Sequence, residues 1–143
     1  PYISTGDIFR KMGGEIKQIL DSGQLVDDET TASLLKRRIE SIDCQDGFII
    51  DGYPRSTEQL KNFDPNFDLV FYLKLSQDLV IKRLLQRGRA DDTEELIKTR
   101  LGLYYQQTEP LLEYYKNKGI LVEIDGAGTV EKIQQDIREY LPK

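Results

Sequence analysis

The sequence has 143 residues, of which 38% are hydrophobic, and a formal net charge of −5. This length suits one domain with a modest hydrophobic core. The negative balance argues against a surface that binds nucleic acid without regard to sequence, because such surfaces are basic. The chain has no histidine and only one cysteine, Cys44. Histidine-based triads, histidine-ligated metals and an internal disulfide are therefore excluded, and we expect chemistry carried by carboxylates, cations and backbone groups.

The sequence contains no signal-peptide pattern and no apolar run long enough to cross a membrane. We therefore expect a cytoplasmic protein with neither a membrane nor a nucleic acid as partner. The sequence begins at Pro1 without a methionine. We interpret this as a processed or truncated form of a longer chain.

Polar capping residues and glycines divide the first part of the chain into a short strand and three expected helices. Residues 1–3 look like the end of a strand, and Ser4-Thr5-Gly6-Asp7 offers N-caps for a helix that begins near its last residue. Glycines at positions 13 and 14 interrupt this helix, and glycine 23 ends a second run over 15–22. Asp27 or Asp28 can cap the third helix, which continues to Ile39.

The stretch Phe48–Arg55 has the pattern of a buried parallel strand that ends at a functional edge. Apolar residues 48–50 run into an aspartate, a glycine and a proline, and ligands of open α/β sheets collect at the carboxyl ends of strands. Asp51 could hold a hydrated metal ion there, and Arg55 could bind phosphate oxygens. An ordinary strand followed by a proline turn, with Asp51 as a local cap, explains the same residues, so both interpretations stay open at this point.

The second part of the chain alternates strands with helices. Glu95 follows Asp92 by three residues, as in a capping box. Pro110 is expected to break or kink a long helical pattern, which gives two helices. Strands that alternate with helices predict an α/β fold, a doubly wound parallel sheet flanked by helices. The expected elements are a short helix over 56–63, strands over 69–75 and 120–124, a helix that Ser76 caps and Gly88 ends, the long pattern from 92, and a terminal helix that Thr129 starts and Pro142 closes.

Arginines recur at the expected loop edges and helix caps. Scattered surface arginines are the ordinary explanation for any one of them. Together they suit phosphoryl transfer, which needs positioned phosphate chains and neutralised charge more than covalent chemistry by the protein. The set comprises Arg10, Arg55, Arg83, Arg87, Arg89 and Arg100.

Four stretches carry a resemblance to a known family. They are Ser4-Thr-Gly-Asp-Ile-Phe-Arg10, Gly23-Gln-Leu-Val26, Asp51-Gly-Tyr-Pro-Arg55 with Gln59, and Arg87-Gly-Arg-Ala-Asp-Asp92. In this order, over essentially the whole chain, they resemble the adenylate kinases, nucleoside monophosphate kinases with the P-loop fold. The resemblance implies a single domain over residues 1–143, a monomer when complete, and reversible Mg²⁺-dependent phosphoryl transfer from ATP to AMP that gives two ADP.

The resemblance also implies where the acceptor nucleotide, AMP, would bind. The arginines at positions 10 and 55 would hold its phosphate, the glutamine at position 59 would contact its base, and the backbone of residues 23–26 would line the adenine slot. The implied AMP-binding residues are Thr5, Arg10, Gly23, Gln24, Leu25, Val26, Gly52, Arg55 and Gln59.

A second set of residues is implied for the donor nucleotide and the transfer step. Arg83 would lie over the ATP base, and Asp51 would hold Mg²⁺ through water. A glycine-rich loop would lie against the same base, although a strand-to-helix turn that needs glycine explains that loop equally well. The implied ATP-binding residues are Arg83, Arg87, Gly126, Ala127 and Gly128. The implied catalytic residues are Arg87, Arg89, Arg100 and Asp51, and the implied lid acids are Asp91 and Asp92.

Three features depart from the family pattern. The implied lid, about residues 86–92, is very short, and the acceptor arm, about residues 4–26, also looks short. The sequence contains no G-x-x-x-x-G-K-[ST] loop, so we expect the first strand, phosphate loop and helix of the family to be absent from it. In the family that strand lies between the strands resembled by 48–51 and 69–75. We therefore expect two strand edges that face a gap, and no kinase activity from these residues alone.

Two other functions remain open. A UMP/CMP kinase of the same superfamily is the nearest enzymatic alternative, and Thr5 disfavours it because pyrimidine-type relatives usually carry alanine there. A noncatalytic nucleotide-binding protein is favoured by the missing phosphate loop. The retention of Asp51 and of the arginines argues against that second alternative.

Overall fold

Strands form two separate parallel pairs within the residues that the computed structural model describes, namely 1–22, 24 and 26–141. The first pair is β1 (Tyr2–Ser4) with β2 (Ile49–Asp51), and the second is β3 (Val70–Lys74) with β4 (Leu121–Asp125). The predicted parallel α/β arrangement is confirmed. The strands do not form one continuous sheet, because no hydrogen bond joins β2 to β3 within the described residues. This agrees with the gap expected between these two strands.

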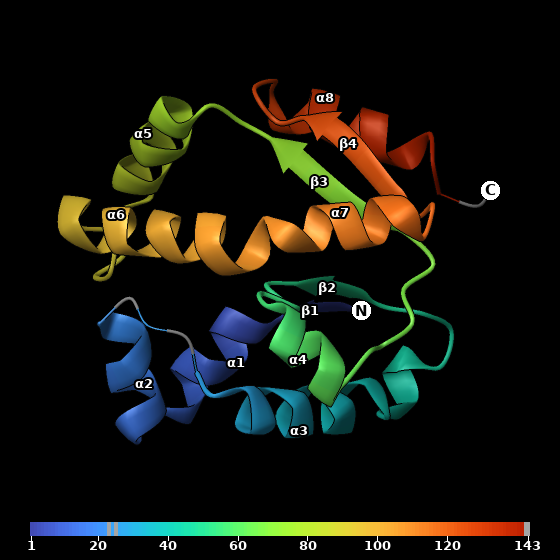
Figure 1. The fold of residues 1–143 in the computed structure, drawn as a ribbon, viewed down its shortest axis with the longest axis horizontal. Helices are drawn as coiled ribbons and strands as arrows, with labels where there is room; N and C mark the ends of the chain where they lie inside the picture. Colours follow the sequence, from blue (N-terminus) through green and yellow to red (C-terminus); the bar gives the residue numbers. More distant parts are fainter. Residues whose placement is uncertain (23, 25, 142–143) are drawn as a thin grey trace.

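Short helices from the first part of the chain pack around β1 and β2 (Figure 1). They are α1 (Thr5–Met12), α2 (Gly14–Asp21), α3 (Asp28–Ile39), the 3-10 turn η1 (Ile42–Cys44) and α4 (Thr57–Asn62). The Ser4 hydroxyl accepts a hydrogen bond from the Asp7 N–H at 3.3 Å, and the Asp27 carboxylate accepts one from the Thr30 N–H at 2.8 Å. These predicted caps are confirmed, whereas the predicted cap at Gly23 lies outside the described residues.

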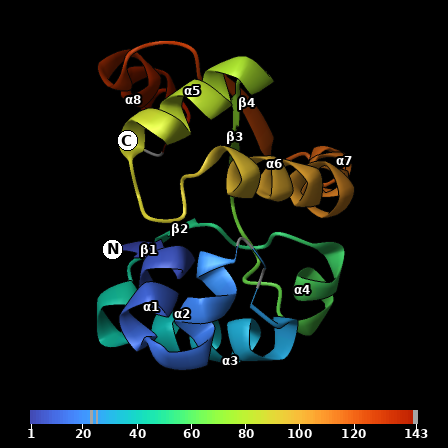
Figure 2. The same cartoon turned by 90° about the vertical axis from the view of Figure 1, so that its left-hand side faces the viewer.

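The second strand pair lies in the other half of the molecule, with a long helix between the two pairs (Figures 1 and 2). Its helices are α5 (Gln77–Arg87), α6 (Glu94–Leu103), the π-helical turn η2 (Tyr104–Thr108), α7 (Pro110–Asn117) and α8 (Val130–Arg138). As predicted, Ser76 caps α5, Thr129 caps α8, and Gly88 ends α5 with a positive φ of 66°.

The predicted division of the long helical pattern at Pro110 is confirmed, and the π-helical turn η2 joins the two helices. Pro110 is the first residue of α7, and α6 reaches it through the π-helical turn, in which the Glu109 N–H donates to the Tyr104 carbonyl at 2.9 Å. A proline inside a helix lacks the N–H for the usual bond and clashes with the carbonyl four residues before it. The wider π turn accommodates both effects, so α6, η2 and α7 continue in one direction.

The predicted capping box at Asp92 is wrong. The N-cap of α6 is Thr93, whose hydroxyl accepts from the Leu96 N–H at 3.3 Å, and the helix begins at Glu94. The Asp92 side chain is fully buried and binds arginines instead. Asp92 therefore forms long-range ion pairs with Arg87 and Arg100 instead of capping α6.

Two groups of buried side chains form the core. The first comprises Ile3, Leu35, Cys44 and Tyr53, and the second comprises Leu60, Leu111 and Tyr115. Phe67 packs against both groups and so connects the layer around β1 and β2 to the long helix. Burial of each large apolar side chain of this kind contributes about 1.5–3 kcal/mol relative to exposure.

The strands beside the gap are less buried than the sequence indicated. Ile49 in β2 is 62% exposed and Leu73 in β3 is 43% exposed. Full burial of a parallel strand needs covered faces and neighbours on both sides, and β2 and β3 each have one neighbour in the described part of the chain.

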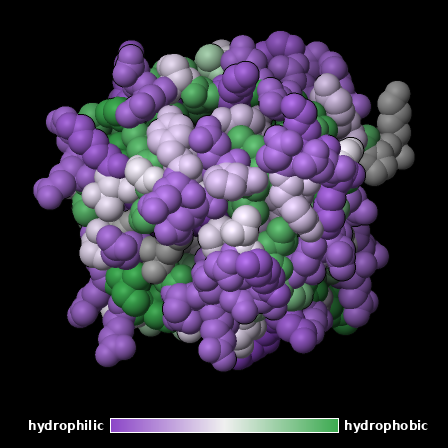
Figure 3. All heavy atoms as spheres, in the orientation of Figure 1, coloured by the Kyte–Doolittle hydropathy of each residue, from purple (hydrophilic) through white to green (hydrophobic). Residues whose placement is uncertain are grey.

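The face of the molecule drawn in Figure 3 is mainly hydrophilic. Figure 3 shows hydrophobic residues in small separate areas of the face seen in Figure 1. No helix among residues 1–22, 24 and 26–141 is both long and apolar enough to span a bilayer.

A protein made of these 143 residues alone should aggregate or melt without a cooperative transition. The unpaired edges of β2 and β3 carry exposed apolar side chains and open backbone groups, which favour association between chains. Circular dichroism melts and light scattering measure both properties. The control is the same chain preceded by a hydrophobic strand, a G-x-x-x-x-G-K-[ST] loop and a helix, which should melt cooperatively. A monodisperse, cooperatively melting monomer of the 143 residues would contradict the expectation.

Candidate active site

A cavity of about 260 Å³ lies beside the carboxyl ends of β1 and β2, against α1, α6 and the loop after α5. Figure 2 shows that loop descending from α5 towards β1 and α1 before it turns into α6. The lining therefore combines residues that are far apart in the sequence, and it contains five arginines and three aspartates. The lining residues are Tyr2, Ser4, Gly6, Asp7, Arg10, Gln24, Asp51, Arg55, Arg87, Arg89, Asp91 and Arg100.

The side chains of Thr5 and Arg55 closely approach the backbone of Gly52 beside the cavity. The buried Thr5 hydroxyl donates to the Gly52 carbonyl at 3.0 Å and lies 3.2 Å from the Asp51 carbonyl. Gly52 has a φ of 87°, and a Cβ there would lie 2.6 Å from Thr5 Oγ1 and 3.0 Å from Arg55 Nη2. Only glycine satisfies both the conformation and the contact, so this glycine lets α1, β2 and the arginine meet.

Among the residues that the structure describes, neutral groups alone hold Arg55. Its N–H donates to Gln59 Oε1 at 2.8 Å, its Nε donates to the Gly52 carbonyl at 3.0 Å, and its carbonyl accepts from the Thr108 hydroxyl at 2.6 Å. Within the described residues its guanidinium forms no ion pair with a carboxylate. Burial lowers the pKa of Arg55, Asp51 opposes this shift, and Arg100 and Arg10 add to it. An anionic ligand in the cavity would supply the missing partner.

A smaller hollow of about 20 Å³ adjoins Arg55. Gln59 and Val26 are 3% and 4% exposed beside it, and the Gln59 amide nitrogen makes no hydrogen bond within the described chain. The hollow thus offers apolar walls with a few polar groups, as sites for planar ligands do. Its lining comprises Thr5, Gly6, Phe9, Val26, Thr31, Gly52, Arg55 and Gln59.

Asp92 holds the arginines on the opposite side of the first cavity. Its fully buried carboxylate accepts from Arg87 Nε at 2.8 Å, Arg87 Nη2 at 2.7 Å and Arg100 Nη2 at 2.8 Å. The Arg89 N–H adds a bond at 3.1 Å. Arg87, followed by Arg100 and the Arg89 N–H, holds the pKa of Asp92 well below its usual range, although burial opposes the shift. The guanidinium groups of Arg87 and Arg100 are thereby fixed close together.

The neighbouring carboxylates pair with further arginines. Arg100 Nη2 donates to the Asp91 carbonyl at 2.6 Å, and Arg100 Nη1 to its carboxylate at 3.2 Å. Arg10 pairs with Asp7 one turn before it on α1, and this bond lowers the pKa of Asp7. Arg89 Nη2 lies 4.0 Å from the same carboxylate. The loop after α5 therefore contacts α1 through opposite charges.

Asp51 ends β2 at the cavity with its side chain exposed. The Tyr2 hydroxyl donates to Asp51 Oδ2 at 2.8 Å, and this bond raises the pKa of Tyr2. The described residues contain no cluster of three or more potential metal ligands. A lone carboxylate suits Mg²⁺ that keeps its own waters and binds phosphate oxygens, so Asp51 fits a contact to the ion through water.

Arg83 and the loop after β4 contact each other away from both cavities. Arg83 Nη1 donates to the Gly126 carbonyl at 2.7 Å, and its Nη2 to the carbonyls of Gly128 at 3.2 Å and Ala127 at 3.3 Å. A Cβ at Gly126 would lie 2.9 Å from Leu75 Cγ. The requirement for glycine at this turn, one of the two interpretations left open, thus has a steric cause.

Most predicted site residues surround the two cavities. Asp92 lies behind the first, while Arg83 and residues 126–128 line neither. Gly23 and Leu25 lie outside the described residues. Sequence reasoning missed Tyr2, for which there was no local signal, and Asp7, which lies within the first family-like stretch but was interpreted as a cap.

The sequence was also compared with known proteins. A family model described as adenylate kinase matches residues 1–120. An adenylate kinase of Corynebacterium aurimucosum is 42% identical over 157 aligned positions, which cover 100% of this chain and 86% of that protein. An adenylate kinase of Rhodococcus erythropolis is 41% identical over 93% of this chain and 80% of its own length. One of Prochlorococcus marinus is 39% identical over 98% of this chain and 84% of its own length.

The variants below are made in the 143 residues preceded by the strand, phosphate loop and helix of the control described above, which we call the full-length protein. In this protein, Asp92→Asn should lower the free energy of unfolding by about 1.5–3 kcal/mol, the range for hydrogen bonds to charged groups. The amide has no negative charge to offset the two arginines, and its NH₂ group cannot accept the bonds that Arg87 Nε and the Arg89 N–H make to Oδ2. Urea denaturation measures the change. The control, Glu94→Gln, removes an exposed pair with Lys98 and should lower it by about 0.5 kcal/mol or less. Equal effects of the two substitutions would contradict the assigned role of Asp92.

The stabilisation by Asp92 should also depend on pH. Its folded-state pKa lies below its unfolded-state value, which is about 3.9 for an ordinary aspartate. The contribution is therefore fully present above that value and is lost as the pH falls through the folded-state pKa. The difference in unfolding free energy between the unsubstituted protein and the Asp92→Asn variant should shrink below about pH 4. Urea denaturation across a pH series tests this, and a difference that grows on acidification would refute it.

Proposed function

Because this chain belongs to the adenylate kinase family of phosphotransferases, we propose that it transfers a phosphoryl group reversibly from ATP to AMP and gives two ADP. The observation that supports this proposal most is the arginine-lined cavity in which Arg55 has no carboxylate partner within the described residues. Phosphoryl transfer needs two phosphate chains in line and their charges neutralised, and cationic side chains in a partly enclosed site supply both.

The acceptor side of the proposed site is the part of the cavity next to the hollow. Arg55 and Arg10 would bind the AMP phosphate, while Thr5, Val26 and Gln59 would contact its base. The Gln59 amide nitrogen, which makes no hydrogen bond within the described residues, and the buried walls around it support this assignment. The further proposed contacts are Gly23, Gln24, Leu25 and Gly52.

The transfer step is assigned to the opposite side of the cavity. Arg87, Arg89 and Arg100 would stabilise the charge on the phosphoryl group as it moves between the nucleotides. The fixed positions of Arg87 and Arg100 support this, because donors that need no rearrangement stabilise a transition state best. Asp92 and Asp91 would act by holding the arginines in place.

Asp51 would orient the Mg²⁺ that accompanies ATP, through a water ligand of the ion. When bound, the ion neutralises charge on the donor phosphates. Arg83 and residues Gly126–Gly128 would contact the ATP base. Their mutual hydrogen bonds support a shared position for the two elements.

The remaining assignments concern the whole molecule. We propose a single domain over residues 1–143, with an acceptor arm at about residues 4–26 and a lid at about 86–92. The contact between Arg89 and Asp7 supports a lid that reaches the acceptor arm. A monomeric, cytoplasmic protein that binds ATP, AMP and ADP and no nucleic acid completes the proposal, consistent with the net charge of −5.

The full-length protein should use AMP far better than UMP or CMP. A site that hydrogen-bonds one base rejects others strongly, because its buried polar groups are left unpaired. A coupled assay of ADP formation with each monophosphate gives the specificity constants. Comparable values for UMP and AMP would refute the assignment of Thr5 and Gln59 and favour the pyrimidine-type alternative.

Substitutions of two arginines should separate acceptor binding from transfer. Arg55→Ala should raise the KM for AMP about tenfold or more and also slow turnover, whereas Arg87→Ala should chiefly lower kcat by about 100-fold, the usual scale for a charge-stabilising group. Steady-state kinetics with AMP varied at saturating ATP measure both.

The matched control is Arg37→Ala, on the exposed side of α3, which should leave all constants within about twofold. If Arg55→Ala and Arg87→Ala behave like Arg37→Ala, both arginines have structural roles only.

A further inference from the structure

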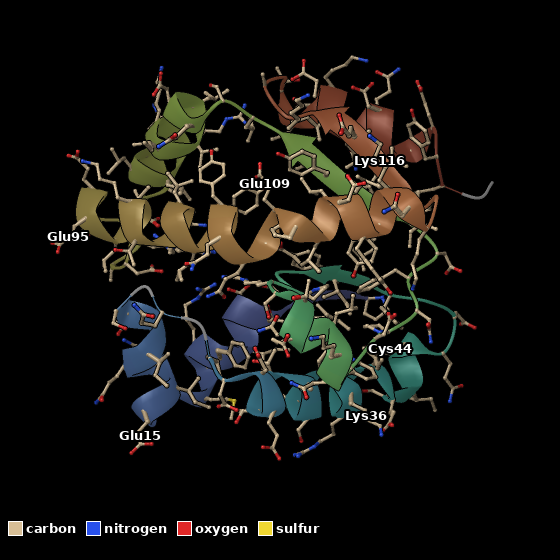
Figure 4. The ribbon with its side chains drawn as sticks, viewed as in Figure 1. Glu15, Lys36, Cys44, Glu95, Glu109 and Lys116 are labelled. Carbon is tan, nitrogen blue, oxygen red and sulfur yellow. The ribbon has the colours of Figure 1, made fainter. Side chains whose placement is uncertain are left out.

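The π-helical turn η2 lies at the centre of the long helix, between the two strand pairs. Figure 4 labels Glu109, the residue that follows the turn, at this position. The Glu109 N–H bonds to a carbonyl five residues earlier, at 2.9 Å. Such turns are rare and frequently occur at functional sites. Pro110 explains why an ordinary α turn is disfavoured here but not what the altered geometry achieves.

One side chain of this turn makes an unusual contact. A threonine in a helix commonly donates its hydroxyl to the carbonyl four residues earlier in the same helix. Thr31 does so to the Asp27 carbonyl at 2.9 Å, and Thr99 does so to the Glu95 carbonyl at 3.1 Å. Thr108 instead donates to the Arg55 carbonyl at 2.6 Å, across 53 residues of sequence.

With this contact, both the N–H and the carbonyl of Arg55 are hydrogen-bonded. The Arg55 N–H is bound by Gln59 at 2.8 Å, and its carbonyl by Thr108. Removal of the threonine hydroxyl would leave the carbonyl without its partner on a turn that has no regular secondary structure. The guanidinium on the same residue lines both cavities.

The same helix also carries an arginine of the opposite cavity wall. Arg100 lies on α6, where Asp91 and Asp92 hold its guanidinium. Arg55 and Arg100 are close enough for each to affect the other electrostatically, since Arg100 lowers the pKa of Arg55. One continuous helix therefore bears Arg100 at one point and holds the backbone of Arg55 at another.

We propose that Thr108 is a positioning residue that fixes Arg55 relative to Arg100 and so sets the geometry for the acceptor phosphate. This inference rests on the proposed function, in which Arg55 binds AMP and Arg100 stabilises the transferring group. The π turn directs the threonine hydroxyl out of its own helix and towards the loop after β2. Thr108 itself does not line either cavity, so its effect on the reaction passes through Arg55.

The test uses three variants of the full-length protein. Thr108→Val keeps the shape of the side chain and removes the hydroxyl, and Thr108→Ser retains the hydroxyl. Thr99→Val is the matched control, because it removes a threonine hydroxyl that bonds only within its own helix. The measurements are kcat, the KM values for AMP and ATP, the Kd for AMP by calorimetry, and the melting temperature.

Thr108→Val should raise the KM and Kd for AMP about five- to tenfold, with the KM for ATP within about twofold, because a displaced arginine weakens one subsite. Thr108→Ser should bring both AMP constants back to within about twofold of the unsubstituted protein. Thr99→Val should leave both AMP constants within about twofold of the unsubstituted protein. This pattern supports positioning and is not expected of a residue that only stabilises the fold.

Three results would overturn the inference. Thr108→Val could match Thr99→Val in both AMP constants, it could weaken AMP and ATP equally, or Thr108→Ser could fail to restore AMP binding. If the unsubstituted protein binds no AMP by calorimetry and forms no ADP from it, the proposed function fails first, and this inference fails with it.

Discussion

The buried carboxylate of Asp92 is the group on which the arrangement of charges depends. Five arginines line one cavity, and arginine stays protonated throughout the pH range of folded proteins. Their mutual repulsion would open the structure if nothing offset it. Asp92 offsets it at short range, since it accepts from Arg87 and Arg100 together and is itself out of solvent. The loop after α5 and the start of α6 are held at the cavity by the same bonds.

The charges around the cavity are not neutralised evenly. Arg10, Arg87 and Arg100 each have an aspartate at hydrogen-bonding distance, whereas Arg55 is bound only by neutral groups of the described chain. The uncompensated charge therefore lies at the end that adjoins the smaller hollow. In the proposed function, AMP would therefore bind with its phosphate towards the arginines and its base among Thr5, Val26 and Gln59.

Features that follow from neighbouring residues could be predicted from the sequence, such as the caps at Asp27 and Ser76 and the end of α5 at Gly88. Predictions failed where a distant contact decided the outcome. Asp92 binds two arginines instead of capping α6, and Ile49 is exposed because β2 has one strand neighbour among the described residues. The arginines of the site were found because they recur at expected loop edges and helix caps, and all of them except Arg100 also lie in the family-like stretches. Tyr2 and Thr108 were not, because their partners lie 49 and 53 residues away.

The bonds around Asp92 also affect how the length of the loop after α5, the proposed lid, could change in evolution. Arg87 ends α5 and Asp92 immediately precedes the cap of α6, so their ion pair joins the two ends of the connecting loop. Ala90, between them, is exposed. The entropy lost on closing a loop grows only with the logarithm of its length. Residues can therefore be gained or lost at Ala90 with little loss of stability. The length of the proposed lid can diverge among descendants while the ion pair between Arg87 and Asp92 is kept.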